Sequence, residues 1–93
     1  METAQAAILR AEAADADQYA GEALLRAKNA LSQAQAAVTA RKPADAIGLA
    51  QMAAAEADYA QARSREASLQ TELARRRAEI SELRRRLGIE STP

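Results

Sequence analysis

The sequence predicts an all-α protein: an antiparallel two-helix hairpin of the coiled-coil type that associates into a four-helix bundle. Alanine, the strongest helix former, occupies 27 of the 93 positions. Apolar residues recur at alternating spacings of three and four in both halves of the chain, as in a coiled coil. Pro43 interrupts the pattern once, near the middle. We therefore expect one domain over residues 1–88 and a polar tail or linker over residues 89–93.

The interruption at Pro43 sets the expected helix boundaries. A proline costs about 3 kcal/mol inside a helix but nothing in the first turn, and it disfavours helical geometry at the residue before it. Asp45 then lies at the positive end of a helix dipole, and Arg41 and Lys42 lie at a negative end. We expect a helix over residues 4–41, a turn at 42–43 and a helix over 44–87. A single kinked helix is the alternative.

The first helix is expected to pack through one seam of large and small residues. The large ones are Leu24, Leu31 and Val38, and Ala20, Ala27 and Ala34 lie between them. Gly21 interrupts this helix at a cost of up to about 1 kcal/mol, and we assign it no close contact.

The second helix carries a longer seam that keeps the heptad spacing without a slip. Its members are Met52, Ala55, Tyr59, Ala62, Glu66, Leu69, Leu73, Arg76, Ile80, Leu83 and Leu87. Gly88 follows as a helix-ending residue, and the arginines at 84–86 suit the negative end of the helix dipole.

Folding the chain at Pro43 pairs each large residue with a small one. Leu31 then faces Ala55 and Leu24 faces Ala62. The further expected pairs are Ala27 with Tyr59, Ala34 with Met52, and Val38 with Gly48. This arrangement also lays the acidic residues 1–24 against the arginine-rich residues 63–86, which favours this pairing over others.

The far end of this hairpin leaves an apolar surface with little cover. It consists of Leu69, Leu73, Ile80, Leu83 and Leu87, which would face only Asp17, Ala13, Ala6 and Thr3. We predict that it is a self-association seam that binds a second copy, with a dimer favoured, or a partner helix. In the alternative, Ile8 and Leu9 rotate inward and cover it.

The residue types argue against an enzyme. The chain has no histidine and no cysteine, so it lacks the most common general base and the thiol nucleophile. Ser64, Ser68 and Ser81 have no base beside them, and we expect all three to face solvent. Glu79 and Glu82 lack the histidine of a di-metal motif, so we expect no metal and no cofactor. Glu72 with Arg76, and Glu82 with Arg86, have the spacing of helical ion pairs.

Two arginine triplets are the strongest local charge feature. They are Arg75, Arg76, Arg77, Arg84, Arg85 and Arg86. They could contact an anionic partner such as nucleic-acid phosphates, lipid headgroups or an acidic envelope polymer. A zero net charge and the lack of stacking aromatic residues disfavour nucleic acid. The other interpretation is a solvated helix surface paired with its own glutamates. The sequence contains no run of 18 apolar residues, so we expect no transmembrane helix.

Two stretches of the chain resemble a known bacterial family. Ala23 to Leu31 resembles part of the pattern A-x-x-x-L-x-x-A-x-x-A-x-x-x-L of its helices. The second helix matches at Ala46, Leu49, Ala50, Ala53, Ala54, Ala57, Asp58, Ala60 and Ala62. Over residues 14–67 the chain thus resembles the "domain of unknown function 4398" family. Lys42-Pro43 stands where members often have a Gly-Asp turn, and the chain shows neither a signal peptide nor a lipid-bearing cysteine.

The resemblance implies an exported envelope protein of Gram-negative bacteria. Members are usually lipoproteins and are sometimes followed by a peptidoglycan-binding domain, so a periplasmic or outer-membrane-anchored location is expected. We expect a non-enzymatic structural domain that acts as a spacer or protein–protein interaction module, with an envelope or peptidoglycan-associated partner possible. The alternative is a cytoplasmic coiled-coil adaptor or nucleic-acid-associated protein that uses the arginine triplets.

Overall fold

The computed structural model describes residues 1–88, which form four helices joined by short turns. They are α1 (Glu2–Ala13), α2 (Ala16–Tyr19), α3 (Gly21–Thr39) and α4 (Pro43–Arg86). The all-α prediction is confirmed, and no strand occurs among the described residues. The expected polar tail at 89–93 lies outside them. The molecule is elongated, measuring 71 × 20 × 17 Å along its principal axes.

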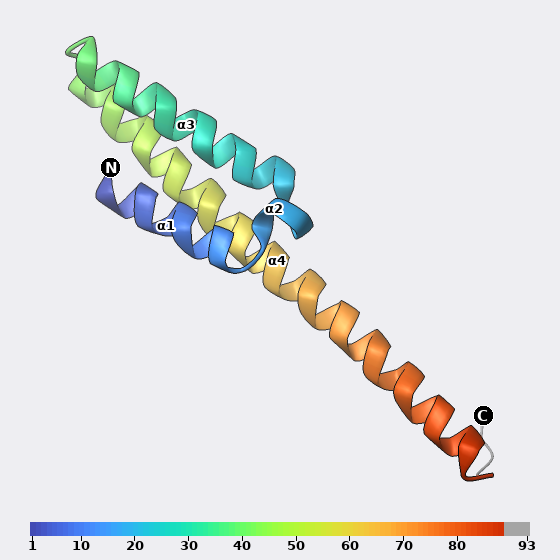
Figure 1. Ribbon diagram of the computed structural model, residues 1–93. Coiled ribbons are helices and arrows are strands. Elements are labelled where there is room, and N and C mark those ends of the chain that lie inside the picture. Colours follow the sequence, from blue (N-terminus) through green and yellow to red (C-terminus); the bar gives the residue numbers. More distant parts are fainter. Residues whose placement is uncertain (89–93) are drawn as a thin grey trace.

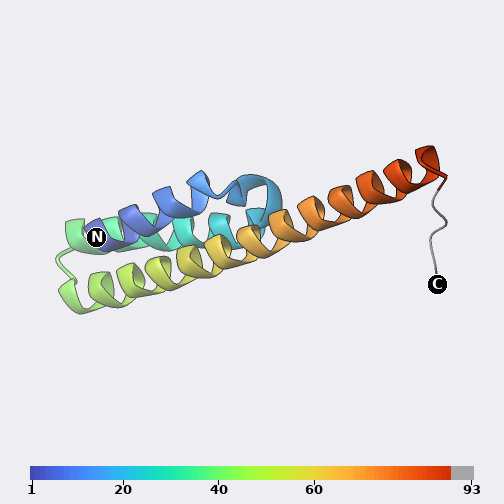
Figure 2. The ribbon, with the colours of Figure 1, turned by 90° about the horizontal axis from the view of Figure 1, so that it is seen from below.

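The molecule has a three-helix part and a projecting single helix (Figures 1 and 2). α1 and α3 both lie against the first half of α4, with α1 running in the same direction as α4 and α3 in the opposite direction. We call this part, α1 to α3 with residues 43–67 of α4, the head. Residues 68–88 continue α4 beyond the head without a neighbouring helix, and we call them the arm.

The single helix expected over residues 4–41 is wrong, because the chain reverses direction between Ala13 and Gly21. Asp15 has φ 62°, in the left-handed region, which Asp enters more easily than most residues. Its amide donates to the carbonyl of Glu12 at 3.0 Å, which ends α1. Ala20 has φ −147° and ψ 46°, and α3 starts at the next residue. The two-helix hairpin is therefore replaced by three helices in residues 1–39, and only α3 and α4 form an antiparallel pair about Pro43.

The turn between α3 and α4 is closed by backbone hydrogen bonds. The Lys42 amide donates to the Ala37 carbonyl at 2.9 Å, and the Arg41 amide donates to the Val38 carbonyl at 3.0 Å. This is the Schellman arrangement, which needs a left-handed residue after the helix, and Arg41 supplies it with φ 60°. Pro43 then occupies the first position of α4, where its missing amide hydrogen costs nothing. At the other end of α4, Gly88 has φ 71° and ends the helix as predicted.

The core is built almost entirely from alanine. Its members are Ala4, Ala7, Ile8, Ala11, Ala16, Ala23, Leu24, Ala27, Ala30, Ala34, Ala37, Ala46, Ala53, Ala57 and Ala60. Alanine keeps the helices close, because a small side chain at each contact shortens the distance between helix axes. Ile8 is buried in the head, so it does not turn inward to cover the arm as the alternative above supposed, and Leu9 is exposed.

The buried face of α4 is not the predicted seam. Ala46, Ala53, Ala57, Ala60 and Ser64 are buried, whereas Met52, Ala55, Tyr59, Ala62 and Glu66 are exposed. The two sets lie on nearly opposite sides of the helix, given about 100° per residue. Where α1 and α3 both pack against α4, the side of α4 between them must carry small side chains. The prediction instead placed the largest side chains of α4 in the core. Consequently Leu24 clusters with Ala57 and Ala60 instead of pairing with Ala62, and Leu31 clusters with Ala53 and Ala54 instead of pairing with Ala55. Tyr59, Met52 and Val38 are exposed instead of being enclosed against the expected Ala27, Ala34 and Gly48.

Ser64 is also placed differently from the prediction. It is fully buried on the face of α4 that packs in the core, and its hydroxyl donates to the Ala60 carbonyl of the same helix at 2.8 Å. Ser68 and Ser81 are exposed. A buried serine is tolerated here because its size matches alanine and its hydrogen bond is satisfied within the helix.

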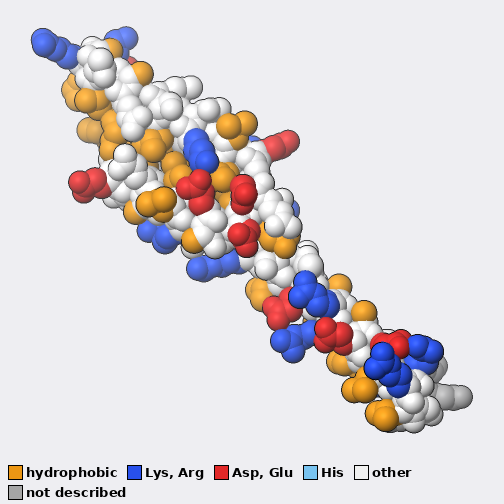
Figure 3. All heavy atoms as spheres, in the orientation of Figure 1, with side chains coloured by type: hydrophobic (Ala, Val, Ile, Leu, Met, Phe, Trp, Pro, Cys, Tyr) orange, Lys and Arg blue, Asp and Glu red, His pale blue; other side chains and the backbone are white. Residues whose placement is uncertain are grey.

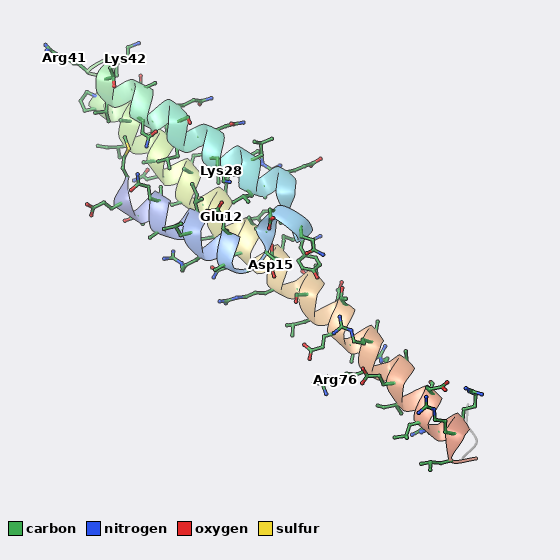
Figure 4. The ribbon with its side chains drawn as sticks, viewed as in Figure 1. Glu12, Asp15, Lys28, Arg41, Lys42 and Arg76 are labelled. Carbon is green, nitrogen blue, oxygen red and sulfur yellow. The ribbon has the colours of Figure 1, made fainter. Side chains whose placement is uncertain are left out.

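Ion pairs between helices lie on the head, not along the arm. Lys28 Nζ approaches Glu12 Oε2 at 2.9 Å, joining α3 to α1 (Figure 4). Arg26 joins α3 to Glu56 of α4 at 3.1 Å, and Arg10 of α1 lies 3.7 Å from Asp58 of α4. The acidic residues 1–24 therefore do not lie against residues 75–86, because α1 folds back onto the other half of α4.

Candidate interaction surface on the projecting helix

The arm carries a row of large apolar side chains that are about half exposed or more, and of these Leu69 borders a hollow that Ala13 and Ala14 at the end of α1 also line. We call this row the α4 stripe: Leu69, Leu73, Ile80, Leu83 and Leu87, exposed by 66%, 49%, 52%, 56% and 65%. Figure 3 shows apolar atoms along the arm between charged side chains. In an ordinary soluble monomer such residues occur singly, and a continuous row marks a contact surface.

The row continues from the arm onto the head. Met52 and Tyr59 are exposed by 55% and 53%, and Ala55 and Ala62 follow them, each three residues later, at heptad spacing. A groove lined by Met52, Ala55 and Tyr59 also borders Arg26 of α3. We call the row from Met52 to Leu87 the extended stripe. It is the seam predicted for the second helix, but it faces outward because α1 and α3 occupy the opposite side of α4.

Two charged residues interrupt the extended stripe. Glu66 and Arg76 hold heptad positions where a coiled coil places apolar side chains. Each has a partner on its own helix: Arg63 lies 3.3 Å from Glu66, and Glu72 lies 3.1 Å from Arg76. Both remain exposed. A helix that docks on the stripe must therefore accommodate one negative and one positive charge.

The arginine triplets are partly neutralised by the glutamates between them. Arg85 and Arg86 both contact Glu82, at 2.7 and 3.2 Å, and Arg76 contacts Glu72. The predicted pairs of Glu72 with Arg76 and Glu82 with Arg86 are confirmed. Within residues 1–88, Arg75, Arg77 and Arg84 have no carboxylate within 4.0 Å. The hydrogen bond from Arg85 lowers the pKa of Glu82; desolvation opposes this effect, and a hydrogen bond from Arg86 adds to it.

Within the described residues, the side chains do not gather into a catalytic or metal-binding group. No cluster of three or more potential metal ligands occurs among them, and Glu79 and Glu82 lie side by side on the arm. Tyr19 is half-buried beside the α2 turn, and Tyr59 belongs to the extended stripe. No described helix combines the length and apolar character that crossing a membrane requires.

Sequence reasoning identified the apolar stripe of the arm but missed the face of α4 that forms the core. The signal was present in the alanines at 46, 50, 53, 57 and 60, which with Ser64 repeat at the same three-and-four spacing. Large residues were taken as the buried set because they gain most from burial. A helix that packs against neighbours on two sides carries two such rows, and α4 has both the alanine row and the row of large residues.

A comparison with protein families gives one match. Residues 1–76 match the family described as "Domain of unknown function (DUF4398)". No curated protein and no solved structure matches the chain significantly.

Proposed function

The chain belongs to the DUF4398 family, and from this membership together with the exposed stripe on α4 we propose that it is a non-enzymatic structural module of a Gram-negative cell-envelope protein. The head gives the module a fixed shape. The arm acts as a spacer that carries a docking surface for another helix. The observation that carries the proposal is the α4 stripe, five large apolar side chains on a helix without a neighbour.

The energetics support docking through the stripe. Full burial of an exposed leucine or isoleucine side chain contributes about 1.5–3 kcal/mol, before the entropic cost of association is subtracted. A single exposed leucine is normal on a protein surface, but five large apolar residues on one face of a helix indicate a contact surface. A helix in an apolar groove or against an apolar row recognises its partner through residues at this heptad spacing. The arm is therefore suited to bind another amphipathic helix.

The envelope location is supported by the family resemblance described above. We propose that the full-length protein is held in the periplasm or at the outer membrane, as a lipoprotein, where the arm could reach a neighbouring envelope or peptidoglycan-associated protein. The arginine triplets contribute less to this proposal, because three of their six members are already paired with Glu72 and Glu82.

The test places a photoreactive amino acid at Leu83, on the stripe, in the protein expressed from its native gene. Ala78 serves as the matched control, because it is exposed and lies on the same arm away from the stripe. We expect discrete crosslinked products from Leu83 in the envelope fraction and none from Ala78. Leu73→Glu should abolish these products, whereas Ala74→Glu should not. Recovery of the protein only from the cytoplasm, or the absence of a stripe-dependent product, would contradict the proposal.

A further inference from the structure

The spacing of Glu66 and Arg76 on the extended stripe carries information about its partner. Both side chains stand in the apolar row, and they lie five residues on either side of Thr71. A charge in an apolar helix interface is costly unless opposite charges surround it, and Glu66 and Arg76 each have one such partner, on their own helix. A partner that brings an acid to Arg76 and a base to Glu66 removes both costs, and a second copy of α4 in the opposite direction does so.

We propose that two copies of this chain pair through their α4 helices, antiparallel and centred on Thr71. The inference rests on the proposed function of the stripe as a docking surface and identifies its occupant. In this register, each residue faces the one that lies equally far on the other side of Thr71. Glu66 then faces Arg76 of the second copy, and the same contact occurs twice by symmetry.

The apolar residues of the extended stripe match in the same register. Leu69 faces Leu73 of the second copy at the centre, and Tyr59 faces its Leu83. Towards the ends, the small residues of the head face the large residues of the arm: Ala62 faces Ile80, and Ala55 faces Leu87. Alternation of large and small residues is what close packing of two helices requires. The paired region from Ala55 to Leu87 is about 48 Å long, from a rise of about 1.5 Å per residue.

Charges at the edges of this interface are largely complementary. Next to the core positions, Glu56 comes beside Arg84 of the second copy, and Asp58 comes beside Arg86. Both carboxylates also keep an arginine of their own chain, Arg26 for Glu56 and Arg10 for Asp58. On the same edge as Asp58, Arg65 comes beside Glu79. Arg84 and Glu79 have no ion-pair partner within residues 1–88. Like charges meet at two places, Glu72 with its own copy and Arg63 with Arg77, which leaves the attractive pairs in excess.

Other registers leave the two interrupting charges unmatched. A parallel dimer in register places Glu66 against Glu66 and Arg76 against Arg76, although it forms favourable edge pairs between Glu72 and Arg77 and between Glu79 and Arg84. An antiparallel dimer centred on Ala78 packs the five stripe residues together but sets Arg76 against Ile80. The register centred on Thr71 is the one of these three that pairs both charges and covers the apolar row.

The shape of the head permits this pairing. α1 and α3 contact the buried side of α4, which we call its alanine face: Ala46, Ala53, Ala57 and Ala60. This face is nearly opposite the extended stripe, so the two helices leave Ala55 to Glu66 of the stripe exposed to a second helix. The arm of each copy then lies along the head of the other. At each end of the dimer, α1, α3 and α4 of one copy and the arm of its partner form a four-helix arrangement.

Reversal of the two charges tests the register by analytical ultracentrifugation of the purified chain. Glu66→Arg alone and Arg76→Glu alone should each weaken the dimer by about tenfold or more, because each creates two like-charge contacts. The double variant Glu66→Arg/Arg76→Glu should restore the affinity to near the original value. Circular dichroism confirms that all three remain helical. In a parallel dimer each position faces its own copy, so like charges still face like charges in all three variants and the single variants change the affinity little. Single variants that do not weaken the dimer, or a double variant that does not restore it, overturn the register.

Spin-label distances give an independent measurement. The chain has no cysteine, so single cysteines can be introduced and labelled at Thr71, Ala78 and Arg85, which are spaced by seven residues on the side of α4 away from the extended stripe. In the proposed dimer, the two labels are level at Thr71 and offset along the axis by about 21 Å at Ala78 and about 42 Å at Arg85, from about 1.5 Å per residue. A parallel dimer gives the same distance at all three sites, and pairing about Ala78 gives the shortest distance there.

The outcomes separate this inference from the proposed function. A dimer with a different distance pattern overturns the register but leaves the stripe as the docking surface. A chain that stays monomeric at high concentration overturns self-pairing. In that case the crosslinking test at Leu83 still decides whether the arm docks on another protein, since its products would exceed or differ from twice the chain mass.

Discussion

The side chain of Arg26 on α3 donates a hydrogen bond from Nε to Oε2 of Glu56 on α4, at 3.1 Å. This contact fixes how the two antiparallel helices align. The register expected from the heptad seams would have set Arg26 opposite Ala60, which is instead fully buried. The observed alignment is shifted by about one helical turn, and it turns the alanine face of α4 inward.

The pair of Arg26 and Glu56 is expected to specify the alignment more than to stabilise it. Because the Arg26 side chain is half exposed, a double-mutant cycle with Arg26→Ala and Glu56→Ala should give a coupling energy of about 0.2–1 kcal/mol. The measurement is thermal or urea unfolding of the four variants. A coupling energy of several kcal/mol would contradict the solvent exposure of this contact.

The identity of the buried face can be tested by adding volume to alanine on either side of α4. Ala57→Leu inserts a large side chain where Ala57 is fully buried, so it should destabilise the fold by about 1–3 kcal/mol. Ala55→Leu is the matched control, because Ala55 is exposed and lies two residues away. At low protein concentration it should change the free energy of unfolding little. The opposite order of the two effects would mean that the predicted seam, not the alanine face, forms the core.

The left-handed conformation of Arg41 makes a specific substitution favourable. A non-glycine residue in this region costs about 1–2 kcal/mol, which glycine avoids. Arg41→Gly should therefore raise the free energy of unfolding by about 0.5–1 kcal/mol. This value is the relief of the left-handed strain minus the larger backbone entropy that glycine loses on folding. Gln33→Gly, at an exposed position inside α3, should lower it by about 0.5–1 kcal/mol. Equal loss of stability in both variants would show that the turn does not hold Arg41 at positive φ.

The carboxyl of Glu82 provides a pH-dependent test of the arm. Its pKa is lowered in the folded chain, chiefly by the hydrogen bond from Arg85. A lowered folded-state pKa stabilises the fold above the unfolded-state pKa, and the contribution is lost as the pH falls through the folded-state value. An NMR titration should place the Glu82 pKa below its ordinary value, and Arg85→Gln should raise it. Arg75→Gln is the control, because Arg75 does not contact Glu82 through an ion pair, and it should leave the Glu82 pKa nearly unchanged.

The candidate surface could be read from the sequence better than the core could. Apart from Ala74 and Ala78, the residues between the members of the stripe from Leu69 to Leu87 are polar or charged, so the heptad spacing of large apolar residues stands out there. In residues 46–64, apolar residues occupy more than one side of the helix. Periodicity alone could not decide between Met52 and Tyr59 on one face and Ala53, Ala57 and Ala60 on the other.

The reversal of the chain between α1 and α3 could not be predicted from the spacing of residues along the sequence. Asp15, Asp17 and Gly21 are weak helix formers, but isolated examples are common inside helices. The break forms because burying Ala4, Ala7, Ile8 and Ala11 against α3 and α4 outweighs the cost of the left-handed Asp15. That gain depends on residues far away in the sequence.

By itself, the sequence determined the helical class, the start of a new helix at Pro43, the helix-ending Gly88 and the local pairs of Glu72 with Arg76 and Glu82 with Arg86. Each of these depends on residues within about one turn of one another, so local propensity and spacing suffice. The tertiary structure alone decided that α1 folds back, that alanine forms the core and that the large apolar residues of α4 face outward. These features depend on which helices meet, and a third helix beside α4 changed which of its faces is buried.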